Sequence, residues 1–207
     1  MTRKDEAILD VGRKMIFSEA QALLAIGSSL GDAFMDAVTM LLECRGKIIL
    51  TGMGKSGYVA RKIAATLTST GMPSVFLHPA EAAHGDLGII AEGDIVVALS
   101  YSGETDEVVG VARFAKRSGN GVVAMTGDGA SSLATLADVH LDIMVKEEDS
   151  VLNIVPTAST TAQLAMGDAL ATAMMHARNF QAHDFGHLHP GGYIERRIKM
   201  TTDREVE

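Results

Sequence analysis

The chain has 207 residues, of which 47% are hydrophobic, enough to bury one sizeable core. Its 18 basic and 26 acidic residues give a net charge of -8 without a cluster of Lys and Arg, so a nucleic-acid-binding surface is not expected. No apolar run is long enough for a membrane span or follows the charged amino terminus as in a secretory signal, which predicts a cytoplasmic protein.

Short strands and helices alternate along most of the chain. Two helices come first, since apolar residues recur at helical spacing from Ala7 to Ile26 and from Phe34 to Leu42. A long helix over Thr157 to Ala177 comes last. The strands predicted between them cover Lys47–Thr51, Ser74–Leu77, Asp94–Leu99, Gly121–Thr126 and Val139–Ile143, with helices at Lys55–Ser69, Glu104–Ser118 and near Leu133.

This alternation predicts the fold class. Short apolar strands separated by helices are typical of an α/β protein whose parallel sheet is covered by helices on both faces. No linker rich in Pro, Gly or Ser divides the chain, so a single domain over residues 1–207 is expected. In such sheets ligands bind beyond the carboxyl ends of the strands. The single cysteine, Cys44, lies in an apolar pattern and is expected to be a buried packing residue.

Two turns at predicted strand ends have the composition of anion sites. The first, T-G-M-G-K-S-G from Thr51 to Gly57, follows an apolar strand and opens a helix, where backbone amides can surround an anion. The second, S-Y-S-G-E-T from Ser100 to Thr105, stands in the same relation to its strand. Together they predict a phosphorylated metabolite as ligand.

Two common nucleotide motifs fit the first turn poorly. A P-loop needs four residues between its first Gly and the Gly-Lys pair, whereas one residue separates Gly52 from Gly54. The dinucleotide motif needs an acidic residue about twenty positions later, where this chain reads S-V-F-L-H from Ser74 to His78. The second, serine-rich turn therefore carries more weight than the glycine pattern.

Six short segments of the chain can be compared with known families: T-G-M-G-K-S-G (51–57), H-P-A-E-A-A-H-G-D-L-G (78–88), S-Y-S-G-E-T (100–105), P-T-A-S-T-T (156–161), M-G-D-A-L-A (166–171) and H-P-G-G (189–192). Taken together and in this order, they closely resemble the sugar isomerase (SIS) domain of arabinose 5-phosphate isomerases. The match spans roughly residues 5 to 198. The resemblance implies a three-layer sandwich with a five-stranded parallel sheet, an SIS core over about residues 30–178, and a homotetramer.

The implied activity is the interconversion of D-arabinose 5-phosphate and D-ribulose 5-phosphate, which supplies the synthesis of Kdo for lipopolysaccharide or capsule. Many family members carry a pair of CBS modules after this domain, and none is expected here. Enediol chemistry needs a base, a group that stabilises the oxygen charge and a phosphate anchor, but no redox cofactor.

The resemblance implies the following roles at the matching positions. His189 would move the proton, reaching the site of an adjacent subunit, while Lys55, His84, Glu104 and Glu147 would complete the catalytic set. The substrate-binding residues expected are Gly54, Ser56, Ser100, Ser102, Thr105, Ser159, Thr160 and Thr161.

Each catalytic role has a structural alternative. Lys55 could be an exposed lysine in a first helical turn, and Glu104 could be a favourable charge at a helix start. His84 could be a loop histidine bonded to backbone, and His189 could cap a helix. His140, His176 and His183 have the pattern of ordinary strand, helix and loop residues.

The chain departs from the family pattern in two places. Family members usually read E-A-x-P-L-G-L-A-P-T where this chain reads E-E-D-S-V-L-N-I-V-P-T, so either Glu147 or Glu148 could be the family glutamate; Glu147 is preferred. Leu188 also replaces the serine often found before H-P-G-G, and His187 is additional. These differences leave open an isomerase for another phosphosugar.

A non-catalytic sugar-phosphate sensor is a further alternative, although no helix-turn-helix extension accompanies the domain. His84, His187 and His189 could in principle bind a transition metal. Because the expected chemistry works without one, neither a metal nor a cofactor is predicted.

Overall fold

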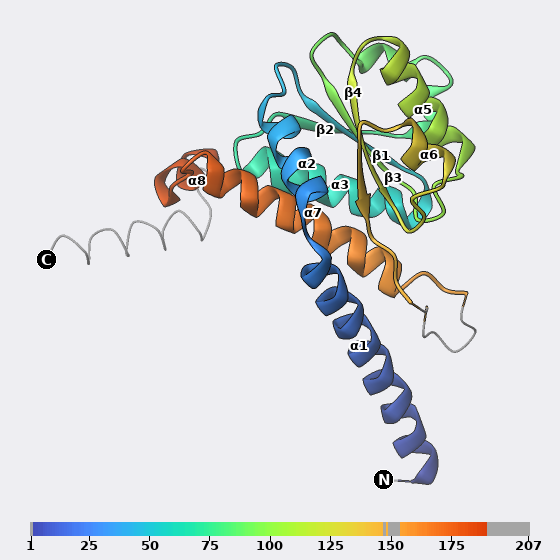
Figure 1. The fold of residues 1–207 in the computed structure, drawn as a ribbon. Coiled ribbons are helices and arrows are strands. Elements are labelled where there is room, and N and C mark those ends of the chain that lie inside the picture. Colours follow the sequence, from blue (N-terminus) through green and yellow to red (C-terminus); the bar gives the residue numbers. More distant parts are fainter. Residues whose placement is uncertain (1, 147, 149–153, 190–207) are drawn as a thin grey trace, which may run out of the picture.

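Five parallel strands form one sheet in the order β2-β1-β3-β4-β5 (Figure 1). The computed structural model describes residues 2–146, 148 and 154–189. The strands are β1 (Ile48–Gly52), β2 (Ser74–Leu77), β3 (Ile95–Leu99), β4 (Gly121–Thr126) and β5 (Val139–Asp142). The helices are α1 (Arg3–Ser29), α2 (Asp32–Leu42), α3 (Gly54–Ser69), α4 (Pro79–Ala82), α5 (Asp106–Arg117), α6 (Ser132–Leu136), α7 (Ala158–Ala177) and α8 (Ala182–Leu188), with a 3-10 turn η1 (Asp86–Ile89).

The structure confirms the α/β class and all five predicted strands, whose ends differ from the prediction by one residue at most. The sequence pattern does not reveal α4 and α8, because they are too short for a helical spacing to be recognised. His183 was expected in a loop but lies in α8. The helix predicted from Glu104 begins at Asp106, since Thr105 keeps an extended backbone as its N-cap.

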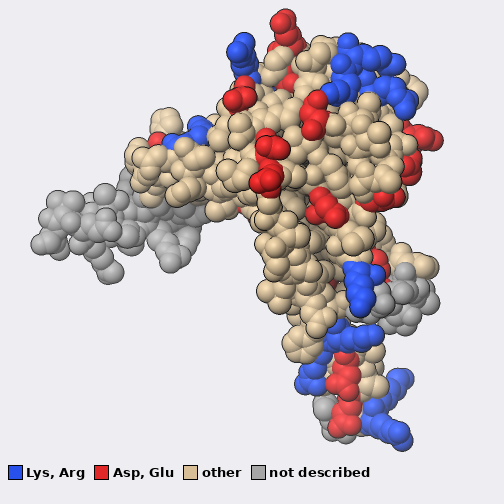
Figure 2. Space-filling view, in the orientation of Figure 1, with Lys and Arg blue, Asp and Glu red and all other residues tan. Residues whose placement is uncertain are grey.

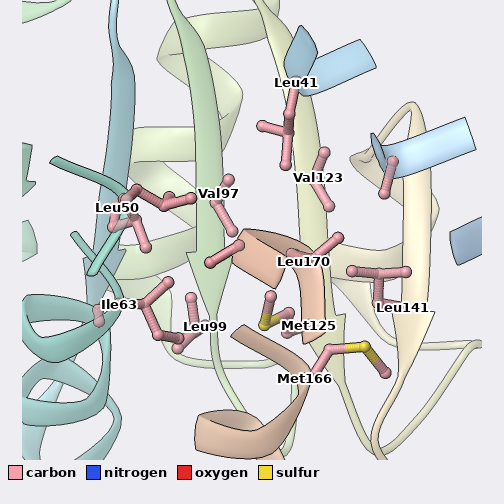
Figure 3. Close-up of a cluster of buried hydrophobic side chains, with 14 of the residues drawn as sticks. Leu41, Leu50, Ile63, Val97, Leu99, Val123, Met125, Leu141, Met166 and Leu170 are labelled. Carbon is pink, nitrogen blue, oxygen red and sulfur yellow. The ribbon is translucent and has the colours of Figure 1, made fainter. Parts of the chain in front are cut away.

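Each face of the sheet carries its own apolar cluster, which makes three layers. On one face, Ile63 of α3 and Leu170 of α7 pack with Leu50 and Val97 of the sheet (Figure 3). On the other face, helices α4, α5 and α6 pack on the alternate strand residues, including Ile49. Because β1 and β3 are buried on both faces, every residue in them is buried, and they appear in the sequence as continuous apolar runs.

The strand order creates one switch point in the sheet. The chain passes from β1 to β2 on one side and then returns to place β3 on the other side of β1. The connections after β1 and β3 therefore diverge. The position between their carboxyl ends, called the crevice below, is where ligands of such sheets bind. Both turns predicted as anion sites lie at this switch point.

A buried carboxylate joins β1 to β3 at the amino ends of these two strands. Asp94, which is 2% exposed, accepts hydrogen bonds from the backbone N of Lys47 (2.8 Å), from Lys47 Nζ (2.6 Å) and from the backbone N of Ala91 (2.8 Å). Burial alone would raise the pKa of Asp94, but these bonds outweigh it and lower the pKa. The charged group thus fixes the start of both strands.

Helix α1 extends away from the body of the molecule (Figure 1). It carries exposed apolar side chains. Its only buried residue is Ile26, whereas Ile16 is 68% and Leu24 72% exposed. Charged side chains gather in the half of α1 at its free end, whereas the half nearer the body is almost uncharged (Figure 2). None of the described helices is by itself long and apolar enough to cross a membrane; only α1 and α2 together, bent by 80°, reach that length and composition.

Helix α7 packs tightly on α3, and one of its two buried polar side chains, Gln163, has no partner among the described residues. A Cβ atom at Gly167 would lie 2.3 Å from Ile63 Cδ1, so only glycine allows this approach. One turn earlier, Gln163 is fully buried, and neither atom of its amide has a hydrogen-bond partner among the described residues. An enclosed amide without partners costs free energy, which makes Gln163 a weak point of this interface.

Replacing Gln163 with Met should stabilise the fold, since an apolar side chain of similar length removes the unpaired amide. We expect the free energy of unfolding to rise by roughly 1–3 kcal/mol, measured by urea unfolding. Gln21→Met on the exposed part of α1 is the control and should change little. Lower stability of Gln163→Met would mean that the amide has a partner.

Candidate functional site

The turn after β1 brings the backbone of β1 very close to α3. Gly54, at the start of α3, has a φ of +58°, a conformation that glycine adopts without strain. At Gly57, a Cβ atom would lie 2.5 Å from the carbonyl oxygen of Gly52, so the helix could not approach the strand with any larger residue there. The first turn of α3 therefore lies directly over the end of β1, with Lys55 exposed and Ser56 half-buried.

The turn after β3 gathers three of the predicted hydroxyl groups. Ser100, only 3% exposed, lies with its Oγ 2.9 Å from Thr105 Oγ1 and accepts a hydrogen bond from the backbone N of Gly103 (3.1 Å). Ser102 is exposed, and its Oγ accepts a bond from the backbone N of Glu104 (3.3 Å). Hydroxyl groups from three positions are thus held in one tight turn, next to the turn after β1.

Glu104 connects this turn to helix α6. Its Oε1 accepts a hydrogen bond from the backbone N of Ser132 (2.7 Å), the first residue of α6. This bond from the Ser132 backbone, with a second contribution from the Ser132 side chain, lowers the pKa of Glu104. In this chain the carboxylate therefore stabilises the start of α6, while its exposed position leaves it open to solvent at the crevice.

The predicted residues Ser159, Thr160 and Thr161 lie in the first turn of α7, whose amides already have an anionic partner. Glu148 accepts hydrogen bonds from the backbone N of Thr157 (2.9 Å), Ala158 (2.9 Å) and Ser159 (3.1 Å). Burial would raise the pKa of Glu148, but the bonds from Ser159 and Thr157 outweigh it and lower the pKa.

This capping role belongs to the second of the two candidate glutamates, and the sequence did not reveal it. Glu147 lies outside the described residues. The available signal was the acidic pair ahead of P-T-A-S, because a carboxylate near a helix start is favourable.

His189 directly follows α8, whose last residue, Leu188, shares a hollow with Arg61, Ser74 and Phe76. Helix α7 begins near the carboxyl ends of the strands and ends beside the last turn of α3, where Arg178 donates to the carbonyl of Thr70 (3.3 Å). Among the described residues, no contact joins His189 to either serine turn. The described part of one chain therefore gives no direct contact between the predicted base and the predicted phosphate anchor.

The ring of His189 is held in a defined tautomer. It stacks on Phe185 with 4.0 Å between ring centroids, and its Nδ1 lies 2.8 Å from the carbonyl oxygen of Phe185. A carbonyl oxygen only accepts, so Nδ1 must donate, and Nε2 of the neutral ring then carries a lone pair. His189 thus presents a nitrogen that can accept a proton.

His84 lies in the loop after α4 and is exposed. In the described part of the chain, its backbone N donates a hydrogen bond to the carbonyl oxygen of Glu81 (2.9 Å), and its ring forms none. Among the described residues, no group of three or more His, Cys, Asp or Glu is placed to hold a metal ion, so His84, His187 and His189 do not form a common site within one chain.

A cavity on the β2 side of the glycine turn contains residues that the sequence reasoning did not select. It is lined by Gly52, Gly54, Gly57, Tyr58, Arg61, Phe76 and His78. His78 directly follows β2, so the rule that placed sites after β1 and β3 applies to it equally. That position was the signal in the sequence.

Comparison with known proteins agrees with this architecture. Residues 40–173 match the SIS domain family. The chain belongs to this family. It is 47% identical over 191 residues to arabinose 5-phosphate isomerase KdsD of Pseudomonas aeruginosa, covering 92% of this chain and 59% of that protein. It is 44% identical over 195 residues to arabinose 5-phosphate isomerase KpsF of Escherichia coli O6:H1 (strain CFT073), covering 94% and 60%.

Among solved structures, E. coli CFT073 c3406 in complex with arabinose 5-phosphate aligns with a TM-score of 0.86 and 38% identity, covering 92% of this chain and all of that one. The chain spans about three fifths of the length of the KdsD and KpsF proteins that it matches. The SIS fold expected from the sequence motifs is thus confirmed.

Glu148 should make the stability of this SIS domain depend on pH. Because its folded-state pKa is lowered, its contribution is present above the unfolded-state pKa and is lost as the pH falls through the folded-state pKa. Glu148→Gln should therefore cost about 1 kcal/mol at neutral pH, as other cap losses do, and the deficit should vanish in acid. Urea unfolding from neutral to acidic pH measures the difference in unfolding free energy between wild type and Glu148→Gln. Glu92→Gln, at an exposed position, is the control. A deficit that persists unchanged in acid would contradict the capping role.

Gly103 should be irreplaceable in the turn after β3. Its φ is +68°, and a Cβ atom there would lie 2.1 Å from Ser131 Oγ. Gly103→Ala should lower the free energy of unfolding by roughly 1–3 kcal/mol. Gly110→Ala in α5, where a Cβ atom meets nothing within 4 Å, should be neutral or stabilise by up to about 1 kcal/mol. Equal thermal stability of the two variants would show that the turn is not strained.

Proposed function

We propose that this domain is an aldose-ketose isomerase that interconverts D-arabinose 5-phosphate and D-ribulose 5-phosphate. One observation carries the proposal: the hydroxyl turn of Ser100 and Thr105 lies at the switch point of a chain that is 47% identical to an arabinose 5-phosphate isomerase. The 38% identical neighbour in complex with arabinose 5-phosphate supports the same substrate.

The phosphate anchor follows from the two turns at the crevice. Ser56 and the amides near Gly54 lie on one side, and Ser100, Ser102 and Thr105 lie on the other. Hydroxyls and amides bind a phosphate dianion by hydrogen bonds, and the binding energy orients the sugar for reaction. Lys55, exposed at the same edge, supplies a positive charge for the developing oxygen charge.

The chemical step moves one proton between neighbouring carbons. A base removes the proton from C2 of the aldose, the electrons form the C1–C2 double bond of an enediol, and the carbonyl oxygen at C1 gains a proton. The C2 hydroxyl then loses its proton while C1 receives one, which yields the ketose. Nε2 of His189 suits the base because its Nδ1 is held by the Phe185 carbonyl.

The site requires a second subunit in this proposal. Among the described residues His189 has no printed contact with Ser100 of its own chain, which is why we propose that it acts in the site of a neighbour. The exposed apolar side chains of α1 offer a surface for such association, since large unpaired apolar patches are typical of interfaces. A homotetramer, the supply of Kdo synthesis and a cytoplasmic location stay predictions.

The decisive measurement is ketose formation from D-arabinose 5-phosphate. The unaltered protein should turn it over faster than other pentose and hexose phosphates, and His189→Ala should lose about 100-fold or more in kcat, the usual contribution of a general base. His176→Ala, an exposed histidine of α7, is the control and should keep full activity. A better rate with another sugar would change the substrate, and sugar binding without exchange of the C2 hydrogen in deuterated water would favour a sensor.

Mixing two inactive variants tests whether subunits share the site. His189→Ala and Ser100→Ala, dissociated and reassembled together, should regain part of the activity, because some sites then combine an intact histidine from one chain with an intact turn from the other. Absence of any recovery, with mixed assembly verified, would place His189 and Ser100 of one site in the same chain.

A further inference from the structure

The cavity beside the glycine turn has an unusual combination of unpaired polar groups. His78 Nδ1 is enclosed and has no hydrogen-bond partner among the described residues. The His78 ring meets Phe76 edge to face, with 6.2 Å between ring centroids. The guanidinium of Arg61 lies over the same Phe76 ring, 4.2 Å from its centroid, and no acidic side chain pairs with it in the described part of the chain. Polar groups held in this way are available to a ligand.

The cavity continues toward the loop after α4. A second hollow shares Arg61, Phe76 and His78 and extends to Gly85 and Asp86. Its charged groups therefore have both signs, one guanidinium and one carboxylate. Such a lining suits an uncharged group with several hydroxyls, which donate and accept hydrogen bonds, better than a second phosphate.

The position of the cavity matches the length of the substrate. In the order β2-β1-β3, the end of β2 lies two strand spacings from the end of β3, about 10 Å. A phosphate held by the turn after β3 would leave an open five-carbon chain extending across the glycine turn after β1. Its far end, which carries the reacting carbons, would reach the residues that follow β2.

From this geometry we propose that the cavity is the subsite for the sugar chain, in which His78 hydrogen-bonds the oxygens at the reacting end and Arg61 the middle hydroxyls. The proposal rests on the proposed isomerase function and adds residues to it. Nδ1 is the enclosed nitrogen of the His78 ring, so within the described part of the chain Nε2 is the nitrogen left to face a ligand in the cavity. Hydroxyl groups suit it in either neutral tautomer, since they both donate and accept.

The test separates the sugar subsite from the phosphate anchor. Wild type, His78→Asn and His78→Gln are assayed with D-arabinose 5-phosphate, and inorganic phosphate is titrated as a competitive inhibitor. His78→Asn should lose at least tenfold in kcat/KM, because its shorter amide cannot reach the Nε2 position, while the inhibition constant of phosphate stays within twofold. His78→Gln, whose amide reaches further, should recover part of the loss. His176→Asn is the matched control.

Wild-type kcat/KM in His78→Asn, or an equal loss of phosphate inhibition, would overturn the subsite and leave the isomerase proposal intact. If wild type binds D-arabinose 5-phosphate without turning it over, the isomerase proposal fails. The subsite is then tested by binding: His78→Asn should weaken the affinity for the sugar phosphate and leave the affinity for inorganic phosphate unchanged. Should His78→Asn fail to fold, Arg61→Met probes the cavity against Arg113→Met, an exposed control on α5. Arg61→Met should lower kcat/KM for the sugar phosphate while the inhibition constant of phosphate stays within twofold. Equal kcat/KM values for Arg61→Met and Arg113→Met would contradict the subsite.

Discussion

The register between β1 and β3 is the constraint on which the crevice depends. Gly52 pairs with Leu99, so the two strands end level and their turns leave the sheet side by side. At the other end of the same pair, the buried carboxylate of Asp94 bonds both the backbone and the ammonium group of Lys47. A one-residue slip would break these bonds and turn every side chain of β1 to the opposite face. The core and the crevice are therefore fixed together.

Much of this architecture could be predicted because the central strands are buried on both faces. Continuous Val and Ile runs mark β1, β3 and β4, and their predicted ends are correct to one residue. The short helices were missed because α4 and α8 depend on tertiary packing and on local caps rather than on an apolar period. Gln181 and Asp184 form a capping box at α8. The usual capping box begins with Ser or Thr, so the sequence did not indicate a helix start at Gln181.

The residues at the crevice were predictable where suitable side chains lie close together in the sequence, within one turn. Ser100 and Thr105 are in contact because one tight turn holds both, and a turn is local in sequence. Glu148 and His78 required knowledge of distant partners. Glu148 caps a helix that begins about nine residues later in the sequence, and His78 lies beside an arginine from another element. Periodicity carries no information on such contacts, and the family motif favoured a neighbouring glutamate.

Helix α7 explains why a complete isomerase site would need more than one chain. Its first turn lies near the carboxyl ends of the strands, and its twenty residues extend for about 30 Å before α8 begins. The same helix packs along α3 through Gly167, so it cannot bend back toward the serine turns without breaking that contact. In the described part of the chain, the proton acceptor placed after α8 has its printed contacts with Phe185 and none with the phosphate anchor. Under the proposed function, association of subunits is then a condition of catalysis and not only a source of stability.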